Sequence, residues 1–531
     1  MDRLIRTAVF CLALAAPAVA AGPAPAGNDP RTIAHVLNRI GFGARPGDVE
    51  KVRAIGLDRY IDQQLHPDRV SDDALAPRLA GLASVNLSSH EIAQQYERPL
   101  EEKRRQQRAA NSNDSQPAMP DPVQQRANAV VMELSEQKVL RAVYSERQLQ
   151  EVLTDFWFNH FNVDARKGPD RFMLTEYERE TIRPHVLGKF RDLLEATAKS
   201  PAMLFYLDNW MSTDPAGPHP DPRAGRGRIV RGPFGPVFIP PQPRMPQQNA
   251  NQQRRGLNEN YGRELMELHT LGVDGGYTQK DVTEVARAFT GWTIQNPRQG
   301  GGFRYEPRLH DEGPKVVLGH MIKAGGGESD GEQVLDILAR HPSTAKFIAT
   351  ALVRRFVSDT PPQPLVDRAA RRFSDTDGDI REVMRTILTS QEFLAPDAYR
   401  AKVKTPFEFI VSAVRATGAD VGDATPLVRA INQLGMPLYQ CQPPTGYKDT
   451  ANAWVNTGAL VNRMNIALRL ANSQLPRVSV DRDQLPPDSD TMIARILDGD
   501  ASETTRATIA KASAAPQMAA LTLGSPEFQR R

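Results

Sequence analysis

Apolar residues recur along most of this chain at the three- and four-residue spacing of an amphipathic helix. Two start signals accompany the pattern: Ser145 and Gln148 predict a capping box, and Thr278 with Asp281 predicts a looser one. The spacing predicts helices over 33–40, 57–65, 149–157, 282–289, 344–356, 365–373, 380–388, 406–417 and 457–471.

Strand patterns are few. Residues 303–305 and 315–318 flank a turn that contains Pro and Gly, and we expect them to pair as a small hairpin. The fold class is therefore mainly α: a large multi-helix globular body with at most a small β-hairpin and two long polar insertions.

The two insertions interrupt the apolar pattern. Residues 100–128 are rich in Glu, Arg, Gln, Asn and Pro, whereas residues 212–255 hold ten Pro and seven Arg against two acidic residues. Neither stretch can bury enough apolar surface to offset the entropy of ordering. We expect both to be long exposed loops or disordered insertions.

The N-terminus carries the parts of a secretory signal peptide. Arg3 and Arg6 precede a short apolar stretch, which ends in the small residues 18–20. We therefore expect residues 1–20 to be removed and the protein to be exported, either periplasmic or secreted. No later segment approaches the ~20 apolar residues of a transmembrane span.

These patterns divide the chain into seven parts. They are a signal peptide (1–20), an N-terminal helical part (21–99), a polar insertion (100–128), a helical core (129–211), a Pro/Arg-rich insertion (212–255), a second core part with a motif helix and the hairpin (256–475), and a C-terminal polar segment and helix (476–531).

Composition narrows the class of protein. Of the 531 residues 40% are hydrophobic, which is too apolar for a fully disordered chain, and the formal charge of +3 gives no reason to expect a nucleic-acid binder. Cys11 would leave with the signal peptide, so Cys441 would be the one cysteine of the mature chain. It has no basic neighbours to lower its pKa, and we expect a buried, inert thiol.

The segment 255–272 has the highest density of candidate chemistry. At about 100° per residue, Glu264 falls on a helix stripe that is otherwise apolar and aromatic, with Glu267 beside it. A carboxylate on such a face must be paired, bound to a metal, or have a raised pKa. The alternative is a structural Glu satisfied by an Arg or by backbone amides.

His269 lies five residues after Glu264, which on an α-helix places the two nearly opposite each other. Metal pairs on one helix need a spacing of three or four, so this helix alone would not chelate a metal. His160, His310 and Asp311 could add ligands for a zinc or mixed N/O site. The alternatives are a satisfied core histidine at 160 and ordinary turn chemistry at 310–311.

The familiar catalytic motifs are missing from the sequence. It contains no G-x-S-x-G, no phosphate-binding G-x-x-x-x-G-K-[ST], no H-E-x-x-H and no Rossmann fingerprint.

Several short pieces of the chain form a recognisable set: 35–43, 156–161, 258–276, 290–292, His310-Asp311, His341-Pro342 and 454–463. In these pieces the chain resembles the bacterial family called domain of unknown function 1800. The resemblance covers nearly all of the mature chain apart from the two insertions. It implies a large, often exported bacterial protein that is frequently encoded beside a sulfatase-like partner, and no activity is established for the family.

Three hypotheses follow. In the first, the protein is an exported hydrolase with a pocket between helices, in which Glu264, Glu267, His269 and Asn159 are catalytic and His160, His310 and Asp311 bind a divalent metal. In the second, it is a non-catalytic helical scaffold or accessory protein for the sulfatase-like partner. In the third, it binds the cell envelope through its Arg/Pro-rich insertion.

Overall fold

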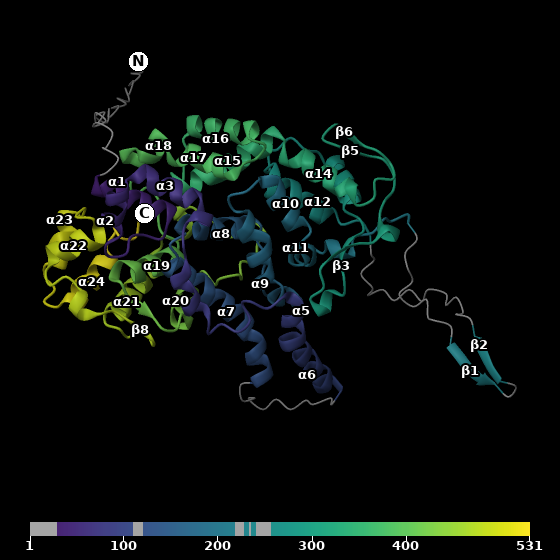
Figure 1. The fold of residues 1–531 in the computed structure, drawn as a ribbon, viewed down its shortest axis with the longest axis horizontal. Coiled ribbons are helices and arrows are strands. Elements are labelled where there is room, and N and C mark those ends of the chain that lie inside the picture. The colour runs from purple at the N-terminus through teal and green to yellow at the C-terminus, as the bar shows by residue number, and fades with distance from the viewer. Residues whose placement is uncertain (1–28, 110–120, 218–227, 233–234, 240–255) are drawn as a thin grey trace, which may run out of the picture.

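Helices make up nearly all of the regular structure in the computed structural model of this chain (Figure 1). The structure describes residues 29–109, 121–217, 228–232, 235–239 and 256–531. The predicted mainly α fold class is therefore confirmed, while the predicted signal peptide lies outside the described residues. No helix in the described ranges has both the length and the apolar character needed to cross a membrane.

The chain order of the elements is as follows. The first helices are α1 (Pro30–Ile40), α2 (Asp48–Ile55), α3 (Leu57–Leu65), α4 (Ala76–Leu79), α5 (Ser89–Ile92), α6 (Arg98–Ala109), α7 (Pro122–Tyr144), α8 (Gln148–His160), α9 (Leu174–Glu176), α10 (Phe190–Ala198) and α11 (Pro201–Tyr206). The later helices are α12 (Glu259–Glu264), α13 (Gln279–Ala288), α14 (Ser329–Ala339), α15 (Pro342–Phe356), α16 (Gln363–Asp375), α17 (Ile380–Leu388), α18 (Gln391–Leu394), α19 (Pro406–Thr417), α20 (Thr425–Gln433), α21 (Thr457–Ala471), α22 (Ser489–Leu497), α23 (Glu503–Ile509) and α24 (Ala515–Gly524). The strands are β1 (Arg228–Gly232), β2 (Gly235–Ile239), β3 (Trp292–Ile294), β4 (Phe303–Tyr305), β5 (Lys315–Val317), β6 (His320–Ile322), β7 (Asp420–Val421) and β8 (Val478–Ser479).

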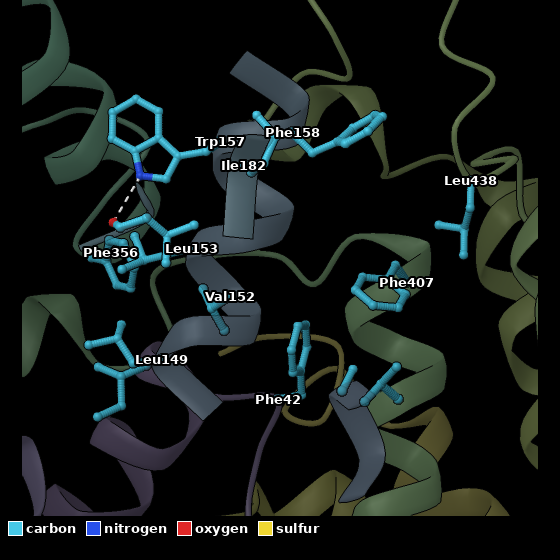
Figure 2. Packing of buried hydrophobic residues seen from close by; sticks show 14 of the residues in the cluster. Phe42, Leu149, Val152, Leu153, Trp157, Phe158, Ile182, Phe356, Phe407 and Leu438 are labelled. Atoms are coloured by element: carbon cyan, nitrogen blue, oxygen red, sulfur yellow. Dashed lines mark hydrogen bonds between the residues drawn. The ribbon is translucent and has the colours of Figure 1, made fainter. Parts of the chain in front are cut away.

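Helix α8 runs through the hydrophobic core (Figure 2). Leu149, Leu153 and Trp157 on its buried face are fully shielded from solvent. The indole N–H of Trp157 donates a hydrogen bond to the carbonyl of Val186 at 3.2 Å, so burial leaves this donor satisfied. Burial of each large apolar side chain stabilises the fold by about 1.5–3 kcal/mol. The C-terminal end of α8 is therefore anchored firmly in the core.

Two groups of helices bring distant segments to that end of α8. Helix α15 packs against α16 and α17, while α7 packs against α19 and α20. Phe356 of α15 and Phe407 of α19 reach the same apolar cluster as α8 (Figure 2). As a result, α8, α15 and the segment that follows α20 surround one region.

One of the two predicted capping boxes is confirmed. Thr278 accepts a hydrogen bond from the backbone of Asp281 at 3.3 Å, and the Asp281 carboxylate accepts from the backbone of Thr278 at 2.9 Å. The box predicted at Ser145 is wrong, because the N-cap of α8 is Arg147. The Gln148 side chain accepts from the backbone N–H of Phe42 at 3.0 Å, a tertiary contact, and its amide donates to the carbonyl of Ser145 at 2.9 Å.

The predicted pairing of 303–305 with 315–318 is wrong. Strand β4 pairs antiparallel with β3, and β5 pairs antiparallel with β6. The β5–β6 turn places Leu318 at φ 49° and Gly319 at φ 80°. Two successive positive φ angles match the twist of a two-residue hairpin, so β5 turns back directly on its sequence neighbour.

Both predicted insertions need correction at their ends. Helix α6 extends to Ala109 and α7 begins at Pro122, so only residues 110–120 of the first insertion lie outside the described residues. In the second, Ser212 and Thr213 are buried, and β1 pairs with β2. The charged side chains of α6 stay in solvent while its backbone is satisfied within the helix, which composition alone does not reveal.

Candidate functional site

Residues 255–272, which we call the motif segment, begin with a capped helix. The side-chain oxygen of Asn258 accepts from the backbone N–H of Tyr261 at 3.1 Å, and its amide donates to the carbonyl of Leu207 at 2.7 Å. Asn258 therefore starts α12 and ties it to the end of α11.

Helix α12 then passes into π-helical turns over Leu265–Thr270. The backbone N–H of Leu271 donates to the carbonyl of Met266 at 2.7 Å, five residues back. The predicted continuous α-helical register is therefore wrong here. A five-residue repeat brings residues 264 and 269 toward the same side of the segment, and π-turns occur frequently at functional sites.

Glu264 has the environment that the sequence predicted. It is half-buried, and burial, followed by the nearby charge of Glu267, raises the pKa of its carboxyl group, while Arg263 acts to lower it. Glu267 accepts a hydrogen bond from the Tyr277 hydroxyl at 3.1 Å. The two carboxylates therefore differ, since one has a hydroxyl partner and the other has a raised pKa.

Two histidines meet at the junction of this segment and α8. His160 Nε2 lies 3.1 Å from the carbonyl oxygen of His269, and the two rings lie 6.4 Å apart. Burial lowers the pKa of His160 to about 4, and burial together with His160 lowers the pKa of His269 to about 3. Both rings are therefore neutral at pH 7.

A cavity of about 360 Å³ lies beside this junction. We name residues 436–450, which follow α20, the cavity loop. The cavity is lined from α8, α15 and the cavity loop, with single residues from α7, from the segment after α8 and from the start of α19. The polar lining residues on which the argument depends are Asp155, Asn159, His160, Arg354, Arg355, Tyr439, Lys448 and Asp449.

Charge in the cavity is unevenly compensated. Arg355 is buried and contacts Glu408 at 2.6 Å and Asp449 at 3.6 Å. Its Nε and Nη2 atoms are nonetheless buried without a hydrogen-bond partner. Among the described residues, the side chains of Arg354 and Lys448 form no ion pair and no hydrogen bond. The lining therefore offers unused cationic donors to a ligand.

Asn159 has a positioning role. Its amide donates to the carbonyl of Tyr447 at 2.9 Å, and its oxygen accepts from the backbone N–H of Tyr447 at 2.7 Å. Gly446 sits so close that a Cβ there would lie 2.3 Å from the Asn159 carbonyl oxygen, at a φ of 70° that glycine tolerates. This clamp holds the cavity loop against α8.

Tyr439 and Lys138 complete the cavity wall. Tyr439 adopts a left-handed φ of 61°, and its hydroxyl donates to Glu178 at 2.5 Å. The Lys138 ammonium pairs with Asp155 at 2.7 Å and lies 5.1 Å from the centre of the Tyr439 ring. Asp155 is therefore ion-paired with a lysine at the cavity wall.

The remaining predicted ligands lie elsewhere. His310 Nε2 is 3.2 Å from Asp330, which also accepts from Lys315 at 2.7 Å. Asp311 is bound by Arg287 at 2.7 Å and 3.0 Å. Neither residue lines the cavity with His160. Within the part of the chain that the structure describes, no group of three His, Cys, Asp or Glu side chains is arranged to hold a metal ion.

Several cavity residues escaped the sequence analysis. Asp155, Asp449 and Arg355 come from three separate segments, and nothing local unites them. The sequence does indicate that Arg355 is buried, since it falls seven residues after Ile348 on the buried face of α15. Cys441, by contrast, is buried as predicted, and burial raises the pKa of its thiol to about 11.

Comparison with known proteins gives one match. The family model described as "Protein of unknown function (DUF1800)" matches residues 35–530. No curated protein and no solved structure matches the chain. The match spans the motif segment, α8, α15 and the cavity loop.

Proposed function

This chain belongs to the DUF1800 family, whose function is unknown, and we propose that it is an exported hydrolase that cleaves a small anionic ester in the cavity beside His160. The proposal assigns substrate binding to the cationic lining and proton transfer to His160.

One observation carries the proposal. The guanidinium group of Arg355 is buried at the cavity with no hydrogen-bond partner for Nε or Nη2, although its third nitrogen is bound to Glu408 and Nη2 lies 3.8 Å from the Asp155 carboxylate. A buried donor without a partner costs about 1–3 kcal/mol, and an anionic ligand would remove that cost. Arg354 and Lys448 add positive charge at the same cavity.

His160 supplies the base. A carbonyl can only accept, so the neutral ring carries its proton on Nε2 and donates it to His269. Nδ1 then keeps its lone pair. A pKa of about 4 makes a weak base, but an anion bound beside the ring favours the protonated form and raises the pKa of His160 toward neutrality.

The proposed step balances without a cofactor. A water molecule transfers a proton to His160 Nδ1 as its oxygen bonds to the acyl carbon of the ester. The bond from that carbon to the leaving oxygen then breaks, and the imidazolium returns its proton to the departing alkoxide. Charge that develops on the carbonyl oxygen is stabilised by Arg355. Glu264 does not line the cavity, so we assign the base to His160 instead.

The test uses the mature chain and a panel of chromogenic anionic esters. Replacement of His160 by Gln is expected to lower kcat by about 10²–10⁴-fold. Since His160 packs in the core, a second variant, Arg354→Gln, tests the same cavity without removing a buried group, and KM is expected to rise roughly tenfold. His90→Gln, which changes an exposed histidine, is the matched control.

Unchanged kcat and KM in both cavity variants would overturn the proposal, provided that their melting curves match that of the parent.

Export is proposed on the N-terminal pattern of residues 1–20. It is checked by cell fractionation and by the mass of the mature chain, which is expected to begin at Ala21.

A divalent metal is tested separately. Elemental analysis of the chain purified without added metal would support a metal site if stoichiometric zinc, iron or manganese is lost in the His160→Gln variant. A metal lost in His90→Gln as well would not belong to this cavity.

The scaffold hypothesis has one observation in its favour. Asn258, Glu267 and Asn159 each have a packing partner, so these polar residues also serve to fix helix geometry. The hypothesis predicts a stable complex with a sulfatase-like exported protein, and no hydrolysis by this chain alone. Co-purification combined with the ester assay separates the two functions.

A further inference from the structure

A second cavity, of about 280 Å³, lies on the other side of the cavity loop. Leu438 lines both cavities, whereas Tyr439 lines the first and Gln440 the second. Helices α7 and α20 supply further walls. The cavity loop is therefore the partition between the two spaces.

The second cavity is basic. Its lining includes Arg166, Arg171 and Arg429, and none of the described residues that line it is acidic. Arg166 already pairs with Asp164 at 2.9 Å. The other two arginines are not neutralised in this way.

Arg171 and Arg429 retain unused donors. Arg171 is half-buried and donates one hydrogen bond, to the side-chain oxygen of Asn128 at 3.1 Å. Arg429 is exposed and has no hydrogen bond or ion pair within the described ranges. The nearby carboxylate of Glu136 accepts instead from Thr425 at 2.8 Å. Burial, followed by the like charge of Arg104, lowers the pKa of Arg171, as expected for a cation without a counter-charge.

Neutral donors complete the lining. Asn128 uses its oxygen to accept from Gln124 and Arg171, so its NH₂ group is free to donate. Asn432 and Gln440 also line the cavity, and their side-chain amides have no hydrogen-bond partner among the described residues. Two guanidinium groups and three side-chain amides thus line the cavity as hydrogen-bond donors, and no acidic residue of the described lining accepts from them.

We propose that this second cavity binds a tetrahedral oxyanion, phosphate or sulfate, either free or as the terminal group of a monoester. Guanidinium groups bind such oxygens in a bidentate manner, and amide N–H groups satisfy the remaining lone pairs. The site goes beyond the proposed hydrolysis and does not depend on it, because it uses residues outside the first cavity.

Calorimetric titration of the whole chain with inorganic phosphate and with sulfate tests the site. We expect one bound anion per chain. Arg171→Gln and Arg429→Gln are each expected to weaken binding about tenfold, the loss of one charge-assisted interaction. Arg171→Lys keeps the charge but loses the planar fork, and it is expected to weaken binding as well.

Two control variants locate the anion. Arg53→Gln removes one exposed positive charge from α2 and is expected to leave the affinity unchanged. Arg354→Gln alters the first cavity and reports any anion bound there, and it is expected to leave the anion of the second cavity in place. Equal loss in Arg53→Gln would indicate a general effect of net charge and would overturn the proposal.

Two further results would overturn it: no binding of either anion, or binding that Arg354→Gln abolishes and Arg171→Gln does not. Comparison of phosphate with phenyl phosphate, and of sulfate with phenyl sulfate, distinguishes a free anion from a monoester group. Tighter binding of the ester assigns the site to the end of a larger ligand. Since Arg171 and Arg429 take part in no ion pair, the variants are expected to melt at the parent temperature.

Discussion

At the scale of single residues, buried charges are the main feature of this protein. Glu264 interrupts an apolar stripe, and burial raises the pKa of its carboxyl group, as that position predicts. Arg355, Glu408 and Arg531 also carry charges in the interior, and all three are buried. Their charges are compatible with burial because Glu408 contacts both guanidinium groups, at 2.6 Å and 2.9 Å.

Replacement of Glu408 by Gln is expected to destabilise the protein in a pH-dependent way. Burial acts to raise the pKa of Glu408, but Arg355 and Arg531 outweigh it and hold the pKa at about 2. This value lies below the ordinary 4.5, so the carboxylate stabilises the fold above pH 4.5 and loses that effect as the pH falls toward 2. The expected loss at pH 7 is about 3–5 kcal/mol, because two buried cations lose the nearest of their carboxylate partners.

Urea unfolding at pH 7 and pH 3 measures this effect, and the difference between parent and variant should narrow at pH 3. Glu392→Gln is the matched control, since its pair with Arg368 lies partly exposed at the surface and is worth about 1 kcal/mol or less. An equal loss at both pH values would contradict the assignment.

At the scale of elements, close approach of backbones shapes the motif segment. Gly262 lies where α12 crosses α13, and a Cβ at this position would lie 2.8 Å from the carbonyl oxygen of Val282. The next part of the segment leaves the α-helical register at Leu265. The sequence predicted a helix ending at Gly272 but could not predict the π-turns, since the same residues also satisfy an α-helical pattern.

Gly262→Ala is expected to destabilise the fold by about 1–3 kcal/mol, because the new methyl group meets the backbone of α13. Alanine's helix propensity favours the variant by about 1 kcal/mol and is outweighed. Gly256→Ala is the control, as a Cβ there meets nothing within 4 Å. Thermal unfolding compares them; similar melting temperatures would mean that α12 and α13 can separate without cost.

At the scale of the whole molecule, the described ends of the Pro/Arg-rich insertion lie against the helical body. In Figure 1, β1 and β2 stand apart from the helices. The two ends of the insertion are joined, because Thr213 donates to the carbonyl of Gly256 at 3.1 Å. The backbone N–H of Asp214 donates to the carbonyl of Leu309 at 2.8 Å. The first residues of the predicted insertion therefore belong to the core.

Deletion of residues 218–255, with a short Gly-Ser linker in their place, is expected to change the melting temperature by less than about 2 °C. A longer deletion that begins at residue 212 is expected to lower the melting temperature by more. It removes two acceptors: the Ser212 carbonyl, which accepts from the backbone N–H of Gly291 at 3.3 Å, and the Ser212 hydroxyl, which accepts from the backbone N–H of Asn258 at 3.2 Å. Equal melting temperatures for the two deletions would show that these end contacts do not contribute to stability.

The candidate site was predictable only in part. Asn159 and His160, two of the predicted site residues, line the first cavity, and Asn159 also holds the cavity loop. His310 and Asp311 were predicted on residue type alone, and each has a different partner.

The helices that the three- and four-residue periodicity predicts follow from the amino-acid sequence, because that periodicity is a local property. Helices α17, α19 and α21 begin and end at the predicted residues. Tertiary structure alone decided which charges meet at Arg355, which strands pair, and that one loop separates two cavities. The physical reason is that desolvation and pairing depend on distances between segments far apart in the chain, which periodicity does not encode.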